Sequence, residues 1–156
     1  MSTRMKILLW PVVLALIPVV WLALLSAFAR RPASLGVTDD RLGAMPSTPN
    51  AVGSQTNDPA YQIAPLEFSG DPAAAWQRLQ QVLTNQPRTT MITASDRYLH
   101  AEARSQIFRF TDDVEFLLLP EQHRIEVRSA SRVGHSDLGV NRARVEKIRQ
   151  EFAAGH

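Results

Sequence analysis

The densest group of charged and hydroxyl side chains lies near the carboxyl terminus, within 124–152 (RIEVRSASRVGHSDLGVNRARVEKIRQEF). Guanidinium groups bind carboxylates or phosphates through paired hydrogen bonds, and hydroxyl groups and a helix amino terminus add further donors for an anion. The residues that could form such a site are Arg128, Ser129, Ser131, Arg132, Asp137, Asn141 and Arg142. The pattern therefore predicts a polar site for an anionic small ligand or a protein partner.

An acidic run precedes this stretch and supplies candidate ion-pair partners, Asp112, Asp113 and Glu115. On a strand, Asp113 and Glu115 share a face while Asp112 points to the other, so only two carboxylates converge. Hard cations require several oxygen ligands from converging segments. Ion pairing with the nearby arginines is therefore expected rather than a metal site. Such pairing would fix the carboxyl-terminal loop against a sheet, which is the structural alternative to a ligand site.

The sequence contains no Gly-rich phosphate loop, nucleophile elbow or HExxH motif, and its four histidines have no paired ligand spacing. It has no cysteine, which excludes a disulfide, a thiolate nucleophile and a zinc–thiolate site. These features favour a binding or scaffold domain without enzymatic activity and without a cofactor. The alternative is an enzyme of hydrolase or isomerase type that uses Asp112, Asp113, Arg128 and Asn141.

The chain is formally basic, with 17 Lys and Arg against 15 Asp and Glu. Arg4 and Lys6 account for the excess, and both precede a long apolar segment. The rest of the chain is formally neutral, whereas nucleic-acid binding requires a basic stripe that neutralises phosphates. We therefore expect no nucleic-acid partner.

The apolar segment from Ile7 to Phe28 carries no charge. As a helix it would span about 33 Å, close to the thickness of roughly 30 Å of the hydrocarbon core of a bilayer. This predicts a membrane anchor over 1–30 and makes the membrane a partner. The alternative is a cleaved signal peptide, since Ala27-Phe28-Ala29 is a cleavage-type motif. A single anchor predicts a single-pass protein of the bacterial inner membrane with a periplasmic domain, and the balanced flanking charges leave its orientation open.

Residues 31–60 are rich in Pro, Gly, Ser, Thr and Asn, which predicts an irregular linker partly packed on the domain that follows, 61–156. In that domain, helical periodicity predicts one helix that begins at Pro72 behind Asp71 and a second that begins near Asn141. Alternation of apolar and polar residues predicts strands near 63–68, 89–93, 99–104, 114–119 and 124–129.

These elements predict an α+β fold, a two-layer sandwich preceded by one transmembrane helix. In the sandwich, an antiparallel sheet of four to five strands carries two helices on one face. The other face would present polar side chains, open to solvent or to a partner: His100, Glu102, Arg104, Glu115, Glu126 and Arg128.

Several stretches of the sequence resemble one known family. They are RPASLGV (31–37), MPSTPNAVGSQ (45–55), IAPLEF (63–68), YLHAE (98–102), FRFTDDVEF (108–116) and VRSASRVGHSDLGVNRARVEKIR (127–149). Over about 31–152 the chain resembles domain-of-unknown-function family 1499 (DUF1499), bacterial envelope and plastid-associated proteins without an assigned activity. The resemblance implies that the linker belongs to the domain, and it implies no mechanism. Many members have two cysteines where this chain has Met45 and Ala51, which argues against thiol chemistry as a shared function.

Overall fold

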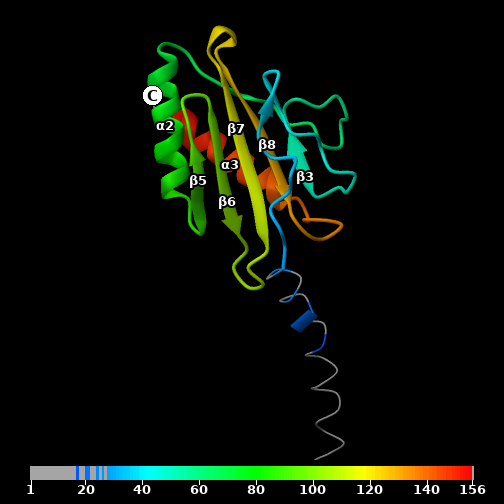
Figure 1. The fold of residues 1–156 in the computed structure, drawn as a ribbon. Coiled ribbons are helices and arrows are strands. Elements are labelled where there is room, and N and C mark those ends of the chain that lie inside the picture. Colours follow the sequence, from blue (N-terminus) through cyan, green and yellow to red (C-terminus); the bar gives the residue numbers. More distant parts are fainter. Residues whose placement is uncertain (1–16, 18–19, 22–23, 25, 27, 156) are drawn as a thin grey trace, which may run out of the picture.

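The fold is an antiparallel sheet with two helices packed on one face (Figure 1). The computed structural model describes residues 17, 20, 21, 24, 26 and 28–155. In chain order the elements are β1 (Val37–Thr38), β2 (Arg41–Leu42), β3 (Ala51–Gly53), β4 (Leu66–Glu67), α2 (Pro72–Asn85), β5 (Thr89–Ala94), β6 (Tyr98–Arg104), β7 (Thr111–Leu119), the 3-10 helix η1 (Pro120–Gln122), β8 (Arg124–Ser131) and α3 (Val140–Ala154).

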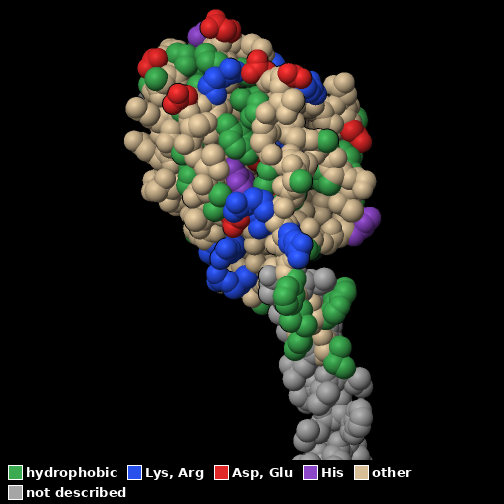
Figure 2. Space-filling model, viewed as in Figure 1, with side chains coloured by type: hydrophobic (Ala, Val, Ile, Leu, Met, Phe, Trp, Pro, Cys, Tyr) green, Lys and Arg blue, Asp and Glu red, His purple; other side chains and the backbone are tan. Residues whose placement is uncertain are grey.

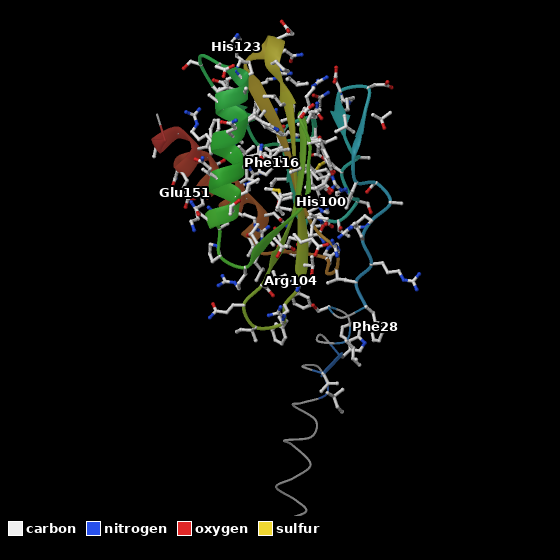
Figure 3. The ribbon with its side chains drawn as sticks, turned by 60° about the vertical axis from the view of Figure 1, so that its left-hand side comes forward. Phe28, His100, Arg104, Phe116, His123 and Glu151 are labelled. Atoms are coloured by element: carbon white, nitrogen blue, oxygen red, sulfur yellow. The ribbon has the colours of Figure 1, made fainter. Side chains whose placement is uncertain are left out.

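The main sheet has six strands, five of them in the order β3-β8-β7-β6-β5, while β4 also pairs with β8. The register places Glu115 of β7 beside His100 of β6 and Arg128 of β8. Successive residues of a strand point to opposite faces, and Phe116, next to Glu115, belongs to the core beneath the helices. Glu115, His100 and Arg128 therefore lie on the face opposite the helices. Figure 3 shows His100 on that face and Phe116 on the side of the helices.

Both helices cover the apolar face of the sheet. The carboxylate of Asp71 accepts hydrogen bonds from the backbone N–H groups of Ala73 and Ala74, and Pro72 occupies the start of α2, where its missing N–H has no partner to lose. The larger buried side chains between helices and sheet include Trp76, Leu79, Leu83, Leu99, Phe116, Ile125, Val127, Val145, Ile148 and Phe152. Removal of these side chains from water holds the two layers together.

The predicted sheet of four to five strands is wrong, because the main sheet has six strands and β1 and β2 form a second sheet. The strands that the sequence does not reveal are β1, β2 and β3, each two or three residues long. Segments this short do not show the alternation of apolar and polar residues by which a strand is recognised.

The predicted transmembrane helix ahead of the sheet is also corrected. Among the residues that the structure describes, no helix has both the length and the apolar character needed to cross a membrane. Most of the segment predicted to form that helix, 7–28, lies outside the described residues.

Residues 31–45, which we call the strap, cross the sheet face opposite the helices (Figure 3). In the strap, Leu42 packs with Leu117 and Leu119 in a small second core. The two arms of the strap approach closely, since a Cβ atom added at Gly43 would lie 1.8 Å from the carbonyl oxygen of Ser34. Only glycine fits at such a distance.

The polar sheet face is therefore covered, whereas the sequence predicts it to be open to solvent or to a partner. The side chains on it that are buried are His100, Glu102, Glu115, Glu126 and Arg128. Part of the stretch predicted as a linker provides the cover, so the chain itself occupies the place expected for solvent or a partner.

Candidate functional site

The residues of the predicted polar site divide between the two faces of the sheet. Side chains alternate along β8, so Arg128 lies on the strap side, whereas Ser129 and Ser131 lie on the helix side. We call the group on the strap side the covered-face cluster: Tyr98, His100, Glu102, Asp113, Glu115, Arg128 and Arg132. The group on the other side is the helix-face cluster: Asn50, Asp112, Ser129, Ser131, Asn141 and Arg144.

Arg132 joins two buried carboxylates in the covered-face cluster. Its Nε and Nη2 donate to the two oxygens of Asp113 at 2.8 and 2.7 Å, and Nη2 also donates to Glu102 Oε1. Arg31 of the strap donates to the same Glu102 oxygen at 2.8 Å. Two guanidinium groups thus neutralise two carboxylates that would be very costly to bury alone.

This pairing controls the protonation of both carboxyl groups. Burial by itself would raise the pKa of Asp113, but hydrogen bonds from Arg132 and His100 outweigh burial and hold that pKa below its ordinary value of 3.8. Burial likewise opposes the hydrogen bonds of Arg31 and Arg132, which hold the pKa of Glu102 below its ordinary 4.5. The hydrogen bond with Asp113 raises the pKa of Arg132 above its usual range. These groups are charged at neutral pH, where such carboxylates are weak bases.

Both oxygens of Glu115 are hydrogen-bonded within the covered-face cluster and the strap. Its Oε2 accepts a hydrogen bond from Arg128 Nη1 at 2.7 Å, and its Oε1 accepts from the Tyr98 hydroxyl and the backbone N–H of Gly36, both at 2.8 Å. Burial and the adjacent Glu115 carboxylate raise the pKa of the Tyr98 hydroxyl well above its usual range. The bond from Gly36 ties the strap directly to the sheet.

Arg128 is less completely bonded than Glu115. The residue is 4% exposed, and its Nε is buried without a hydrogen-bond partner. Buried polar atoms in native proteins nearly always have a partner, so this atom requires an explanation. Arg128 lines two cavities on the strap side, with volumes of about 790 Å³ and about 430 Å³.

The larger cavity lies between the strap and the sheet. Its apolar wall consists of Leu35, Val37, Leu42 and Met45. The smaller cavity is bordered by Asp113 and Arg132, and Ser34, Met45 and Arg128 line both. The two cavities therefore adjoin at Arg128, where an apolar wall meets a buried cation. The described part of the chain contains no group of three or more acidic or histidine side chains that could hold a metal ion.

The helix-face cluster is centred on Asn141, which is fully buried. The amide nitrogen of its side chain donates to the Asn50 carbonyl oxygen at 2.9 Å and to Ser131 Oγ at 3.0 Å. Its side-chain oxygen accepts from Ser129 Oγ and from Arg144 Nη1 at 2.6 Å. All hydrogen-bonding capacity of this side chain is used within the protein. Asn141 thus fastens α3 to β8 and to the chain around Asn50.

A model of a family described as proteins of unknown function, DUF1499, matches residues 41–152. The chain belongs to the DUF1499 family. The matched span of this DUF1499 domain contains both clusters, whereas Arg31 and Gly36 of the strap precede it. No curated protein matches the chain. Because the family is described as having no known function, the function has to be argued from the geometry of the two clusters.

Two predicted site residues of the DUF1499 domain lie outside both clusters. Asp137 accepts hydrogen bonds from the backbone N–H groups of Gly139 at 3.1 Å and Asn141 at 2.8 Å, so it stabilises the first turn of α3. Arg142 is exposed and donates to the carbonyl oxygen of Gln62 at 2.8 Å. Neither residue lines the cavities at Arg128.

Some residues that form hydrogen bonds in the covered-face cluster or tie the strap to it were not among the predicted site residues: Arg31, Gly36, Tyr98, His100 and Glu102. The Nε2 atom of His100 lies 2.7 Å from Asp113 Oδ1, and both side chains are buried. The alternation along 99–104 places His100 and Glu102 on the polar face, so that signal was sufficient to find them. No comparable pattern in the strap indicates that the N–H of Gly36 reaches Glu115.

Proposed function

We propose that this DUF1499 domain is a non-enzymatic binding domain for a small amphipathic anion, held in the cavity between the strap and the sheet. The observation that carries the proposal is the incomplete bonding of Arg128. This guanidinium group is buried, retains an Nε without a hydrogen-bond partner, and lines both adjoining cavities. An oxygen of a carboxylate or phosphate group is the acceptor that such a group binds best.

Arg128 can accept such a ligand without losing its internal partner. Its contact with Glu115 uses Nη1, and Glu115 also holds bonds from Tyr98 and Gly36. The ion pair therefore keeps the guanidinium group fixed in place, and preorganisation of this kind lowers the cost of ordering a side chain on binding.

The cavity walls favour a ligand with an apolar body. Leu35, Val37 and Leu42 of the strap line the larger cavity. Binding sites for small molecules are mostly apolar with a few convergent polar groups, and this cavity combines an apolar wall with Arg128. An alkyl carboxylate or an alkyl phosphate has the required chemistry.

The geometry supports binding rather than the enzymatic alternative. A hydrolase or isomerase that uses Asp112, Asp113, Arg128 and Asn141 would require one substrate to reach all four. Asp112 and Asn141 belong to the helix-face cluster, while Asp113 and Arg128 lie on the opposite face of the sheet. The lowered pKa of Asp113 also makes it a poor general base. A protein partner on the polar face is disfavoured because the strap already covers that face.

The setting of this binding domain in the cell envelope is part of the same proposal. It rests on the uncharged segment 7–28 alone, most of which lies outside the described residues. Protease treatment of intact and of permeabilised cells tests this location separately from ligand binding. Digestion of the domain only after the inner membrane has been permeabilised would contradict it.

Thermal denaturation of the full chain with octanoate, octyl phosphate, acetate and inorganic phosphate tests the proposal. A ligand at 100 times its Kd stabilises the folded state by about 2.7 kcal/mol, which raises the Tm of a chain of this size by roughly 5–10 °C. We expect such a shift with octanoate or octyl phosphate, and only a small shift with acetate or inorganic phosphate. The comparison of the two eight-carbon ligands identifies the preferred anionic group.

Arg128→Lys is the decisive variant in this experiment. It retains a positive charge beside Glu115 but removes the guanidinium fork, so the shift should be lost while the unliganded protein remains folded. Arg142→Ala removes a predicted but distant arginine and should retain the full shift. An equal shift in Arg128→Lys, or no shift with any of the four anions, contradicts the proposal.

A further inference from the structure

Two loops and the start of the described chain lie at one end of the sheet, which we call the basic end. The pairing of Arg104 with Thr111 places the loop 105–110 there. The loop 132–139 leaves the same end, because Ser131 pairs with Asp112 and the backbone N–H of Arg132 donates to the Thr111 carbonyl oxygen at 3.1 Å. Figure 3 shows Phe28 and Arg104 toward this end, whereas His123 lies at the opposite end.

Large apolar side chains protrude at the basic end. Ile107 in one loop is 81% exposed, Leu138 in the other is 93% exposed, and Phe28 is 77% exposed. Leu138 has a backbone φ of 53°, in the left-handed region that non-glycine residues seldom adopt. Its loop is nevertheless ordered by hydrogen bonds from the Leu138 N–H to Ser136 Oγ and from the Gly139 N–H to Asp137. The backbone thus holds an apolar side chain in water at an energetic cost.

The two ends of the sheet differ in surface charge: exposed arginines gather at the basic end, whereas the opposite end carries both acidic residues and arginines (Figure 2). Exposed cations at the basic end are Arg30, Arg88, Arg104 and Arg109. The turns at the opposite end carry the exposed acidic residues Asp39, Asp96 and Glu121 together with the exposed Arg97. The formal neutrality of the globular part therefore hides an excess of exposed positive charge at the basic end.

We propose that the basic end docks on the surface of an anionic phospholipid bilayer. Ile107, Leu138 and Phe28 enter the interfacial layer, and the surrounding arginines contact lipid phosphates. Single apolar side chains on separate segments, surrounded by cations, fit a boundary that is apolar below and anionic above. The acidic residues of the opposite end are directed away from the lipid. The docking does not depend on the cavity at Arg128, and we expect it even if that cavity binds no ligand.

The test uses the absence of cysteine from the chain, which permits one label at a chosen position. The full chain is labelled with the fluorophore NBD in Ile107→Cys, in Leu138→Cys, and in Glu121→Cys as the matched control at the opposite end. Each is added to vesicles of phosphatidylglycerol with phosphatidylcholine and to vesicles of phosphatidylcholine alone. On the anionic vesicles, emission at 107 and 138 should shift to shorter wavelength and increase several-fold, while emission at 121 stays unchanged.

Charge reversal tests the contribution of the arginines. Arg104→Glu with Arg109→Glu should largely abolish the response at 138, as should high salt. Arg97→Glu at the opposite end should leave the response intact, and circular dichroism checks that each variant is folded. An equal response at 121, an equal response on neutral vesicles, or silent labels at 107 and 138 on vesicle-bound chain would overturn the proposal. The last result would indicate attachment through other residues, or an acidic protein as the partner of this end.

Discussion

The covered-face and helix-face clusters share β7 and β8 but use their polar groups differently. On the helix side, Asn141 and its neighbours satisfy one another and border α3. On the strap side, Arg128 keeps one buried atom without a partner beside two cavities. A saturated network specifies one arrangement of the chain, whereas an incomplete one beside a cavity is available to a ligand. This contrast is the basis on which we propose a structural role for the helix-face cluster and a binding role for the covered-face cluster.

The central residues of the two clusters, Asn141 and Arg132, also differ in the partners that they bind. Asn141 makes its bonds with amide, hydroxyl and guanidinium groups, none of which titrates at acid pH. Arg132, by contrast, is bonded to Asp113 and Glu102, whose pKa values are both lowered. Removal of Arg132 should therefore have a strongly pH-dependent effect on stability, whereas removal of Asn141 should have a nearly constant effect.

The largest expected effect is that of Arg132→Met. The variant leaves Asp113 and Glu102 buried without their main cation, so we expect a loss of about 3–5 kcal/mol in the free energy of unfolding at pH 7. In the wild type, the stability contributed by the lowered pKa values is full above the ordinary values of 4.5 and 3.8. It is lost progressively as the pH falls below them and through the lowered pKa values of the folded state. In the variant, the unpaired carboxyl groups take up protons as the pH falls. The difference in unfolding free energy between wild type and variant should therefore decrease on acidification. Urea denaturation at pH 7 and pH 4 measures both effects, and a difference that stays constant would count against ionic stabilisation.

Asn141→Ala should have the second largest effect. Loss of this side chain leaves buried partners such as the Asn50 carbonyl oxygen unsatisfied, which should cost about 2–3 kcal/mol of unfolding free energy. The loss should be nearly the same at pH 7 and pH 4, in contrast to Arg132→Met. Arg142→Ala, the adjacent exposed position, serves as the control and should change stability by less than about 1 kcal/mol. A strong pH dependence in Asn141→Ala would remove the distinction between the clusters.

Gly43→Ala should affect the strap with a smaller global cost. The added Cβ atom would meet the Ser34 carbonyl oxygen, so the arms of the strap must separate, at an expected cost of about 2 kcal/mol. Proteolysis within 31–45 should become faster, while helix content by circular dichroism stays unchanged. Gly70→Ala is the matched glycine control, because an added Cβ atom there meets nothing within 4 Å, although its φ of +79° adds local strain. If the strap resists protease equally in Gly43→Ala, the close approach to Ser34 does not hold it in place.

Tyr98→Phe should have the smallest effect. It removes one of the hydrogen bonds to Glu115, whose other partners remain, so we expect a loss of about 1 kcal/mol at neutral pH. The raised pKa of Tyr98 means that its contribution is full below the ordinary value of 10.0 and is lost as the pH rises above it. The difference between the wild type and Tyr98→Phe should therefore decrease in alkaline solution. Denaturation at pH 8 and pH 11 measures this difference in stability. A difference that grows with pH would contradict the predicted direction of the pH dependence.

The sequence predicts which residues share a face of the sheet far better than it predicts which residues are buried. Alternation along the strands places Glu115 and Arg128 on the polar face, and the register pairs them. The same rule separates Arg128 from Ser129, so the division of the predicted site follows from the sequence, although proximity along the chain suggests a single group. The cover over this face depends on a tertiary contact of Leu42 with Leu117 and on strands of only two residues. No periodic pattern in the sequence of the strap indicates such a contact.

The positive surface charge of the basic end is equally invisible in composition. Arg104 and Arg109 are close in the sequence to Asp112 and Asp113, so local charge is balanced. The fold buries those two aspartates within ion pairs and leaves the arginines exposed at the end of the sheet. Because the aspartates are buried and the arginines are exposed, this end of the sheet has a positive surface charge. The net charge of the sequence does not show it.

Hydrogen exchange of the full chain with and without octanoate tests the assignment of binding to the strap side most directly. We expect octanoate to slow exchange in 33–45 and 127–132, which border the cavities, and to leave the first turn of α3 unchanged. Arg128→Lys should abolish this protection. Protection centred on Asn141, or thermal stabilisation by octanoate with no change in the strap, would contradict the division of the two clusters into one for structure and one for binding.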